Sequence, residues 1–289
     1  MKMPPASVWV NALVISSMIV MMASGLVLLY SIMGILNWSH GQLYMLGAFA
    51  IYYLYVSLGL NYFIALPIAA IAVAVVGMLI ERCLLRPVAD EGFMPASVIS
   101  LGLIFALEGL VTISCGYELK SVPSVMEGII HVGPVYFSIE KSVLIGMAAA
   151  IMLSLYVLIN RTRLGLAIRA AAQEPTVAGL YGVHSARLFT IVMGIGCALA
   201  GLAGGMIAPA YFVDPYIGAK PLITALLSIV LGGLGSLKGA VVGGLIFGLI
   251  TSVGAYYVGP WHELISFLAV IIIILFRPQG IFGMSEARV

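Results

Sequence analysis

Few residues in this sequence could do chemistry, and they do not form a catalytic set. Glu108, in the apolar run LIFALEGLV, and His40, in the polar break NWSHGQ, stand out because the sequence around them is hydrophobic. There is no H-E-x-x-H, no G-x-S-x-G and no cluster of His and carboxylate at metal-ligand spacing. GGLGSLKGA is glycine-rich but lacks the G-x-x-x-x-G-K-S/T of a P-loop. We therefore predict neither catalytic residues nor a metal site, and any ATP that drives the protein must bind another chain.

Ionisable side chains inside membrane spans are costly and are functional hypotheses by default. Glu108 is the only carboxylate well inside an apolar run, and three interpretations stay open: it faces a pathway, pairs with a buried cation, or lies near the outer interface. His40 is either a hydrogen-bonding group of a pathway or a plain turn residue. With Asn37, Ser39 and Gln42 of the same break, these residues are the candidate lining of a translocation pathway.

The composition indicates a polytopic membrane protein built from helices. Hydrophobic residues make up 63% of the chain and charged residues 8%, against about 25% charged in soluble domains. The formal charge of +2 gives no reason to expect a nucleic-acid partner. Cys83, Cys115 and Cys197 lie far apart without a CxxC, so neither a disulfide framework nor a zinc site is predicted.

The apolar segments predict one all-α permease domain over residues 1–289, with about eight or nine membrane helices, some of them broken or short. A span needs about 20 apolar residues, and the first is interpreted as a retained span rather than a signal peptide. Leu222–Leu234 is short, so it is either re-entrant or completes its crossing with residues of the preceding loop, which we favour. The expected segments are Val8–Leu36, Leu43–Leu58, Tyr62–Ile80, Met94–Ser114, Ser142–Ile159, Leu188–Ala208, Leu222–Leu234, Ala240–Val258 and Leu264–Phe276.

Arginines near the span ends predict the orientation. The segments 81–92 and 161–187 and the tail with Arg277 and Arg288 are expected in the cytoplasm, and the loops 115–141 and 209–221 outside. The N-terminus then lies outside, although Lys2 weakly favours the cytoplasmic side for it. In the outer loops, Asp214 is either a turn former or a contact to an external partner, and His262-Glu263 is interpreted as an interfacial pair.

The stretch from Arg161 to Arg187 is the longest polar interruption on the predicted cytoplasmic side. Its first half has the pattern of an amphipathic helix that is too polar to span a bilayer. A membrane protein that holds such a helix outside the lipid usually offers it to a soluble partner.

Two breaks share the pattern G-x-L-x-x-x-H/K-G, at Gly34–Gly41 and Gly232–Gly239. Matching interruptions in two halves of a chain point to the binding region of a transporter, and they suggest a pseudo-repeat. The alternative is two ordinary short loops. Separately, glycines spaced i, i+4 predict close helix packing. These glycines are Gly201/Gly205, Gly239/Gly243 and Gly244/Gly248.

Several motifs together resemble the LivH-type permeases of branched-chain amino acid ABC transporters. GILNWSHGQLYMLGAF at residues 34–49 is similar to their G-I-I-N-F-A-H-G-E-x-Y-M-x-G-A signature. The resemblance continues, in chain order, through IERCLLRPV, RLGLAIRAAAQEPTVAGLYGV, DPYIG, LGGLGSLKGAVVGG and FRPQGIFG. It covers nearly the whole chain.

The resemblance implies a subunit of a bacterial inner-membrane importer with a cytoplasmic C-terminus. Its expected partners are a second, LivM-like permease, two cytoplasmic ATPases that bind ATP and Mg, and a periplasmic substrate-binding protein. The polar stretch would contain the coupling helix, at residues 169–182, which docks on an ATPase. The positions expected to contact the ATPase are Arg169, Ala172, Gln173, Glu174, Gly179 and Gly182.

Two positions depart from the family pattern. Family members commonly have Gln at the position of Glu108 and an acid at the position of Gln42. Either these departures change what the pathway passes, or the two residues only exchange an acid between two positions that line one cavity. Related permeases import urea, short amides or other amino acids, which leaves the substrate open. A secondary transporter or channel and a membrane enzyme are the competing classes, and the first predicts more buried charge than Glu108 alone.

Overall fold

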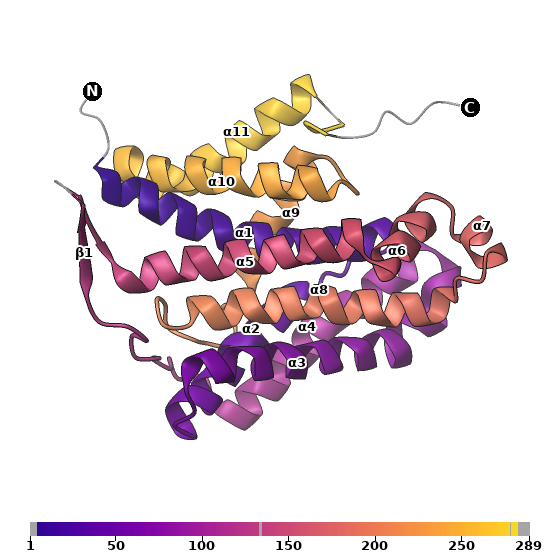
Figure 1. Ribbon diagram of the computed structural model, residues 1–289, viewed down its shortest axis with the longest axis horizontal. Helices are drawn as coiled ribbons and strands as arrows, with labels where there is room; N and C mark the ends of the chain where they lie inside the picture. The colour runs from indigo at the N-terminus through magenta and orange to yellow at the C-terminus, as the bar shows by residue number, and fades with distance from the viewer. Residues whose placement is uncertain (1–4, 133–134, 278, 283–289) are drawn as a thin grey trace.

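The computed structural model describes residues 5–132, 135–277 and 279–282, and over this range the protein is a bundle of helices (Figure 1). Lys2 and Arg288, on which the predicted orientation partly rests, lie outside the described residues. The helices are α1 (Ala6–Met33), α2 (His40–Ile51), α3 (Tyr62–Ile80), α4 (Phe93–Cys115), α5 (Ile139–Arg161), α6 (Arg163–Gln173), α7 (Pro175–Leu180), α8 (Ser185–Ile207), α9 (Ala219–Gly232), α10 (Leu237–Val258) and α11 (His262–Phe276).

The predicted all-α membrane fold is confirmed. Each of the nine expected apolar segments contains a helix, and α9, at 14 residues, is as short as predicted. Within the described residues, six stretches are long and apolar enough to cross a membrane. They are Ser7–Met33, Tyr62–Ala89, Phe93–Cys115, Ile139–Arg161, Ser185–Ile207 and Leu237–Phe276. The total of eight or nine crossings and the pseudo-repeat stay predictions.

The first helix ends earlier than its apolar run. Gly34 has φ of 63°, a left-handed conformation that glycine adopts without strain, and its N–H donates to the carbonyl of Tyr30. Residues 34–37 are then non-helical, and α2 begins only at His40. The break between the helices therefore lies at residues 34–39, three residues earlier than the expected 37–42.

A β-hairpin lies in the expected outer loop 115–141, where the sequence predicted only a loop. Its strands β1 (Ile129–Val132) and β2 (Val135–Ser138) pair antiparallel. The backbone of Lys120 pairs with that of Val213, which joins this loop to the loop 209–221. Figure 1 shows β1 at one end of the bundle and α6 and α7 at the other. The two predicted outer loops therefore share one end of the molecule, opposite the polar stretch.

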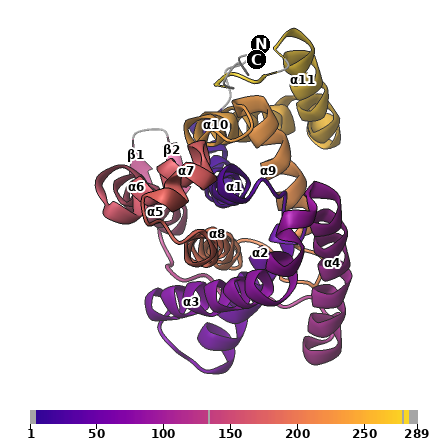
Figure 2. The same cartoon turned by 90° about the vertical axis from the view of Figure 1, so that its right-hand side faces the viewer.

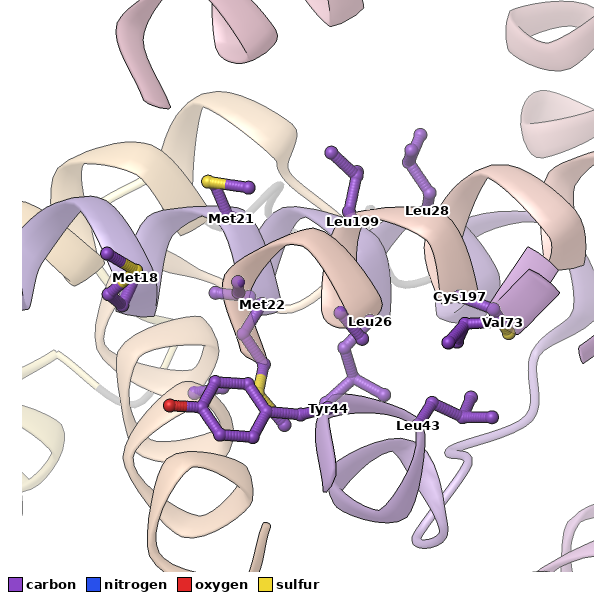
Figure 3. Close-up of a cluster of buried hydrophobic side chains, with 14 of the residues drawn as sticks. Met18, Met21, Met22, Leu26, Leu28, Leu43, Tyr44, Val73, Cys197 and Leu199 are labelled. Carbon is purple, nitrogen blue, oxygen red and sulfur yellow. The ribbon is translucent and has the colours of Figure 1, made fainter. Parts of the chain in front are cut away.

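Helix α1 is the centre of the bundle and α4 is at its edge (Figure 2). In the most apolar stretch of α1, 83% of the residues are buried, whereas in α4 only 11% are. Met21, Met22 and Leu26 of α1 belong to a cluster that also includes Leu43 of α2 and Leu199 of α8 (Figure 3). Most of the surface of α4 is therefore left for lipid or for another chain.

Glycines determine how closely α8 and α10 approach their neighbours. An added Cβ at any of the six glycines singled out in the sequence would come within 3.0 Å of an atom of another helix. Side chains larger than hydrogen do not fit there, as expected where small residues let helix backbones meet. The glycines are Gly201 and Gly205 of α8, and Gly239, Gly243, Gly244 and Gly248 of α10.

Candidate translocation and coupling sites

The first break carries the chain back into the bundle before α2 begins. A Cβ on Gly25 of α1 would lie 3.1 Å from Nε2 of His40, the first residue of α2. Gly25 is eight residues before Met33 at the end of α1, which corresponds to about 12 Å along the helix axis. Helix α2 therefore starts inside the bundle, and its polar N-terminus is enclosed by other helices.

Asn37, Ser39, His40 and Gln42 are all buried, with at most 2% of each residue exposed. Asn37 Oδ1 accepts hydrogen bonds from the Ser39 backbone N–H, at 3.0 Å, and from its hydroxyl, at 2.7 Å. This local turn holds the break just before α2. The side chains of His40 and Gln42 then occupy the first turn of α2, which starts inside the bundle.

Helix α4 contributes the fifth predicted pathway residue. Gln42 Nε2 donates a hydrogen bond of 2.9 Å to Oε1 of Glu108, which is half-buried. A second contact joins the same elements, because the Trp38 N–H donates to Ser100 Oγ at 3.3 Å. The five residues chosen from the sequence thus lie in one region, where the break and α2 meet α4.

Several buried polar atoms in this part of the bundle have no hydrogen-bond partner among the described residues. An unsatisfied buried donor or acceptor costs about 1–3 kcal/mol, and irregular backbone at membrane depth is tolerated only against protein or a water-filled cavity. The atoms therefore call for water or a solute. They are Ser24 Oγ, Asn37 Nδ2, Gln42 Oε1 and Ser97 Oγ.

Sequence reasoning missed three serines of this region: Ser24 on α1, and Ser97 and Ser100 on α4. Ser97 and Ser100 are three residues apart, so they share a face of α4. That spacing within an apolar helix was the available signal. All three are buried.

The second break differs from the first in how its polar groups are satisfied. Ser236 Oγ caps α10 by accepting from the Gly239 N–H at 3.0 Å. The N–H groups of Ile281 and Phe282 donate to the carbonyls of Leu231 and Gly232, the last two residues of α9. Ser31 Oγ of α1 donates to the Gly235 carbonyl at 3.1 Å, so this break lies beside the end of α1. It is a capped turn and has no buried polar side chains like those of the first break.

The polar stretch forms two short helices at one end of the bundle. Helix α6 is anchored to the end of α5, because Thr162 Oγ1 accepts from the Gly165 N–H at 3.0 Å and the Arg169 guanidinium donates to the Ile159 carbonyl. Arg169 is therefore used within the chain. Ala172, Gln173, Glu174, Gly179 and Gly182, the other positions expected to contact an ATPase, are all exposed.

Helix α7 presents apolar side chains away from the bundle. It packs on α6, while Leu180 is 84% exposed and Tyr181, at its C-terminal end, is 87% exposed. Gly182 follows with φ of 86° and turns the chain towards α8. Figure 1 shows α7 projecting at the end of the molecule opposite β1. The arrangement is a small apolar knob, available to another molecule.

A buried carboxylate beside the start of α8 was not singled out by the sequence. Glu81, after α3, is fully buried and accepts two hydrogen bonds from Arg86, at 2.9 and 2.7 Å. Thr190 of α8 donates to Glu81 at 2.9 Å, and Arg86 donates to the Ala186 carbonyl in the first turn of α8 at 2.8 Å. The network ties the start of α8, which follows the knob in the chain, to the end of α3. The i, i+5 spacing of Glu81 and Arg86 does not predict such a contact.

In the outer loops, Asp214 Oδ1 accepts from the Tyr216 N–H at 2.7 Å, as a turn former does. Glu263 forms an ion pair with Lys220 of α9, and His262 Nδ1 lies 2.8 Å from the Gly259 carbonyl oxygen. Among the described residues, no group of three or more His, Cys, Asp or Glu side chains could hold a metal ion.

A bundle of apolar helices, with one helix that starts at depth among buried polar side chains, defines a membrane transport protein. The chain belongs to the family of permease components of branched-chain amino acid transport systems, whose family model matches residues 8–276. The resemblance drawn from the motifs is thereby confirmed.

Curated relatives match along almost their whole length. The high-affinity branched-chain amino acid transport system permease protein BraD of Pseudomonas aeruginosa is 31% identical, over 96% of both chains. The corresponding LivH protein of Escherichia coli K12 is 30% identical, over 96% of this chain and 95% of that protein. A probable LivH protein of Methanocaldococcus jannaschii is 27% identical over 95% and 91%.

A solved structure shares the fold. A chain of PsaBC from Streptococcus pneumoniae, in complex with Fab, superposes with a TM-score of 0.52 at 16% identity, over 94% of this chain and 92% of that one. At this identity the likeness concerns the fold alone.

Proposed function

We propose that the protein is the membrane-spanning permease subunit of an ABC importer for branched-chain amino acids. The buried polar cluster at the start of α2 carries the proposal. It puts side chains without partners inside an apolar bundle, which costs stability and is explained if the region receives water and solute. The names of the relatives, which are branched-chain amino acid permeases over the whole length of this chain, support the substrate.

The pathway runs along the face where α2 meets α4. Glu108 is half-buried there, and the remaining surface of α4 is free to meet a second permease. Because the relatives belong to such systems, we infer a heterodimer with a LivM-like chain, with the solute passing between the two subunits. Asn37, Ser39, His40, Gln42 and Glu108 contribute this chain's share of the lining.

The α6–α7 segment couples the pathway to ATP hydrolysis on separate chains. Its exposed apolar tip at Leu180 and Tyr181 suits a cleft on a soluble ATPase. The Glu81–Arg86–Thr190 network supports this role, because it ties α8 to α3 where the segment ends. Closure of two ATPases, which bind ATP and Mg, then moves α8 and α3 as one rigid body. This end and the C-terminus face the cytoplasm of the bacterial inner membrane, and a binding protein delivers substrate to the other end.

Co-expression tests the class of transporter. The chain, its LivM-like partner and the two ATPases should purify as one complex. In proteoliposomes with the binding protein, ATP should drive uptake of labelled leucine, and the permeases alone should give none under sodium or proton gradients. Uptake without ATPases would indicate a secondary transporter or channel. ATP-driven uptake of urea or short amides in place of leucine would overturn the substrate and leave the class intact.

A further inference from the structure

A cavity of about 550 Å³ lies near the end of the bundle that carries the outer loops. It is bounded by α1, α2, α8, α9, α10, the first residue of α11, Leu119 of the outer loop and the connection between α8 and α9. Its volume falls in the range of about 300–1,000 Å³ that is usual for small-molecule sites. None of the five pathway residues is among the residues that line it. It is therefore a separate compartment.

The packing of α2 against α9 separates the cavity from the polar cluster. A Cβ on Gly41 would come within 3.0 Å of the Gly218 carbonyl, just before α9, so the two backbones touch. Tyr44, one helical turn further along α2, lines the cavity. The cavity therefore lies beside the first turns of α2, on the side from which a solute would enter.

One wall of the cavity is aliphatic. Ile15, Met18 and Ile19 of α1 line it, together with Ile207 of α8 and Ile217 before α9. A branched aliphatic side chain would be surrounded by groups of its own kind. This wall has the chemistry expected for leucine, isoleucine or valine.

Charges of both signs also line the cavity. Asp214 uses Oδ1 to hold the turn at Tyr216, and its negative charge stays at the cavity. Lys220, in the first turn of α9, pairs with Glu263, but both side chains are well exposed, at 65% and 48%. Such exposed pairs are weak, so Lys220 can turn to a ligand carboxylate. A negatively charged lipid headgroup is disfavoured by Asp214 and Glu263.

A hydroxyl of the lining is also without a partner. Thr251 of α10 lines the cavity, and its Oγ1 is buried with no hydrogen-bond partner among the described residues. In contrast, the Thr224 hydroxyl donates to the Pro221 carbonyl at 2.9 Å. The cavity thus offers this unpaired hydroxyl beside its aliphatic wall, in addition to the charges of Asp214 and Lys220.

We propose that this cavity is an entry subsite that binds one aliphatic amino acid as a zwitterion. Lys220 binds its carboxylate, Asp214 binds its ammonium group, and the side chain lies against α1. The proposal rests on the proposed function, because it names where that substrate first meets this subunit. A delivered amino acid would be held here before it enters the pathway at the start of α2.

Binding without the external binding protein tests the subsite. The permease–ATPase complex in lipid nanodiscs is titrated with labelled leucine, and competed with 4-methylpentanoate, which lacks the ammonium group, and isoamylamine, which lacks the carboxylate. We expect saturable leucine binding, with each analogue at least about tenfold weaker, as for a lost charged hydrogen bond. D214N should weaken the binding of leucine about tenfold and leave the binding of 4-methylpentanoate unchanged. Since Asn also has a side-chain oxygen, this variant keeps the turn at Tyr216.

Matched variants make the test specific. E127Q removes an exposed carboxylate of the outer loop that does not line the cavity, and it should leave leucine binding unchanged. T251V keeps the shape of the side chain and should weaken leucine binding a fewfold, because only the free hydroxyl is lost. Retained ATPase association shows that each variant is folded.

Three results would overturn the subsite: no saturable leucine binding, equal leucine binding by D214N and the unmodified complex, or a phospholipid found in the cavity by native mass spectrometry that leucine does not displace. If the complex with its binding protein imports leucine and shows none of this binding, the subsite is wrong and the proposed function stands. If leucine binds as described and is not imported, the subsite stands and the proposed function fails.

Discussion

The hydrogen bond between Gln42 and Glu108 joins the two positions at which this chain departs from its family pattern. In the pattern that the resemblance to LivH-type permeases implies, the acid is at the position of Gln42 and an amide is at the position of Glu108. The contact of 2.9 Å means that either arrangement puts one carboxylate and one amide across the same interface.

Exchange of the acid tests this pair. E108Q removes a charged hydrogen bond worth about 1.5–3 kcal/mol, so ATP-driven leucine uptake should fall about tenfold or more. The double variant E108Q/Q42E should recover part of the loss, because the carboxylate returns to the other side of the contact. The measurement is the initial uptake rate in proteoliposomes, with E127Q as the control. Additive losses in the double variant would contradict the exchange.

A second prediction at the level of single residues concerns Glu81 and the stability of the protein. Removal of one partner of a buried ion pair costs about 3–5 kcal/mol, and we expect the lower end for E81A because Arg86 is one-third exposed. The melting temperature of the purified complex should fall clearly. E91A, which removes an exposed carboxylate from the same segment, should leave it nearly unchanged. Equal melting curves for the two variants would show that the network contributes no stability.

At the scale of helices, glycine contacts set the distance between α9 and α10. A Cβ at Gly243 would press on the Ser228 backbone carbonyl, which cannot move aside as a flexible side chain can. G243A should therefore destabilise the permease by about 1–3 kcal/mol, as overpacking does. G146A in α5 is the control, because nothing lies within 4 Å of its added Cβ. The measurement is the thermal unfolding of both variants. If G243A were as stable as the unmodified permease, the two helices could move apart without a cost in stability.

The short helix α7 supplies the prediction about coupling. L180D puts a charge on a side chain that is 84% exposed, so the permease should fold normally while ATPase binding falls about thirtyfold, as for a hot-spot residue. The control is Y117D, an equally exposed position in the outer loop. Co-purification of the ATPases measures the effect. Normal ATPase binding by L180D, and by G182W at the adjoining turn, would refute the coupling role.

The sequence predicted well which segments are helical, but poorly how deep in the bundle each helix begins. Apolar runs such as those of α3 and α5 are long enough to be recognised as membrane spans, because a span has a minimum length. The depth at which α2 begins depends on how residues 34–39 fold back against α1, which no local pattern encodes. The candidate pathway residues could be chosen from the break because polar groups are rare in apolar surroundings. Glu81 and Ser24 could not, because their burial is decided by helices far away in the chain.

At the scale of the whole molecule, the two ends of the bundle have separate chemistry. One end carries the hairpin, the joined outer loops and the cavity with Asp214 and Lys220, and the other carries the exposed tip of α7 (Figure 1). Helices α1 and α8 run between them and pack closely on one another. A solute and an ATPase would thus act at opposite ends of the same helices, which is the arrangement that an importer needs.

The pairing of Ile281 and Phe282 with the end of α9 also bears on the order in which the protein can mature. The carbonyls of Leu231 and Gly232 find these partners only after α10 and α11 have been synthesised. The central helix α1 likewise meets its main neighbour, α10, late in translation. Helices that are synthesised early must therefore remain incompletely packed in the membrane until the last helices are made. The bundle closes around α1 only when the segment with Ile281 and Phe282 has been synthesised.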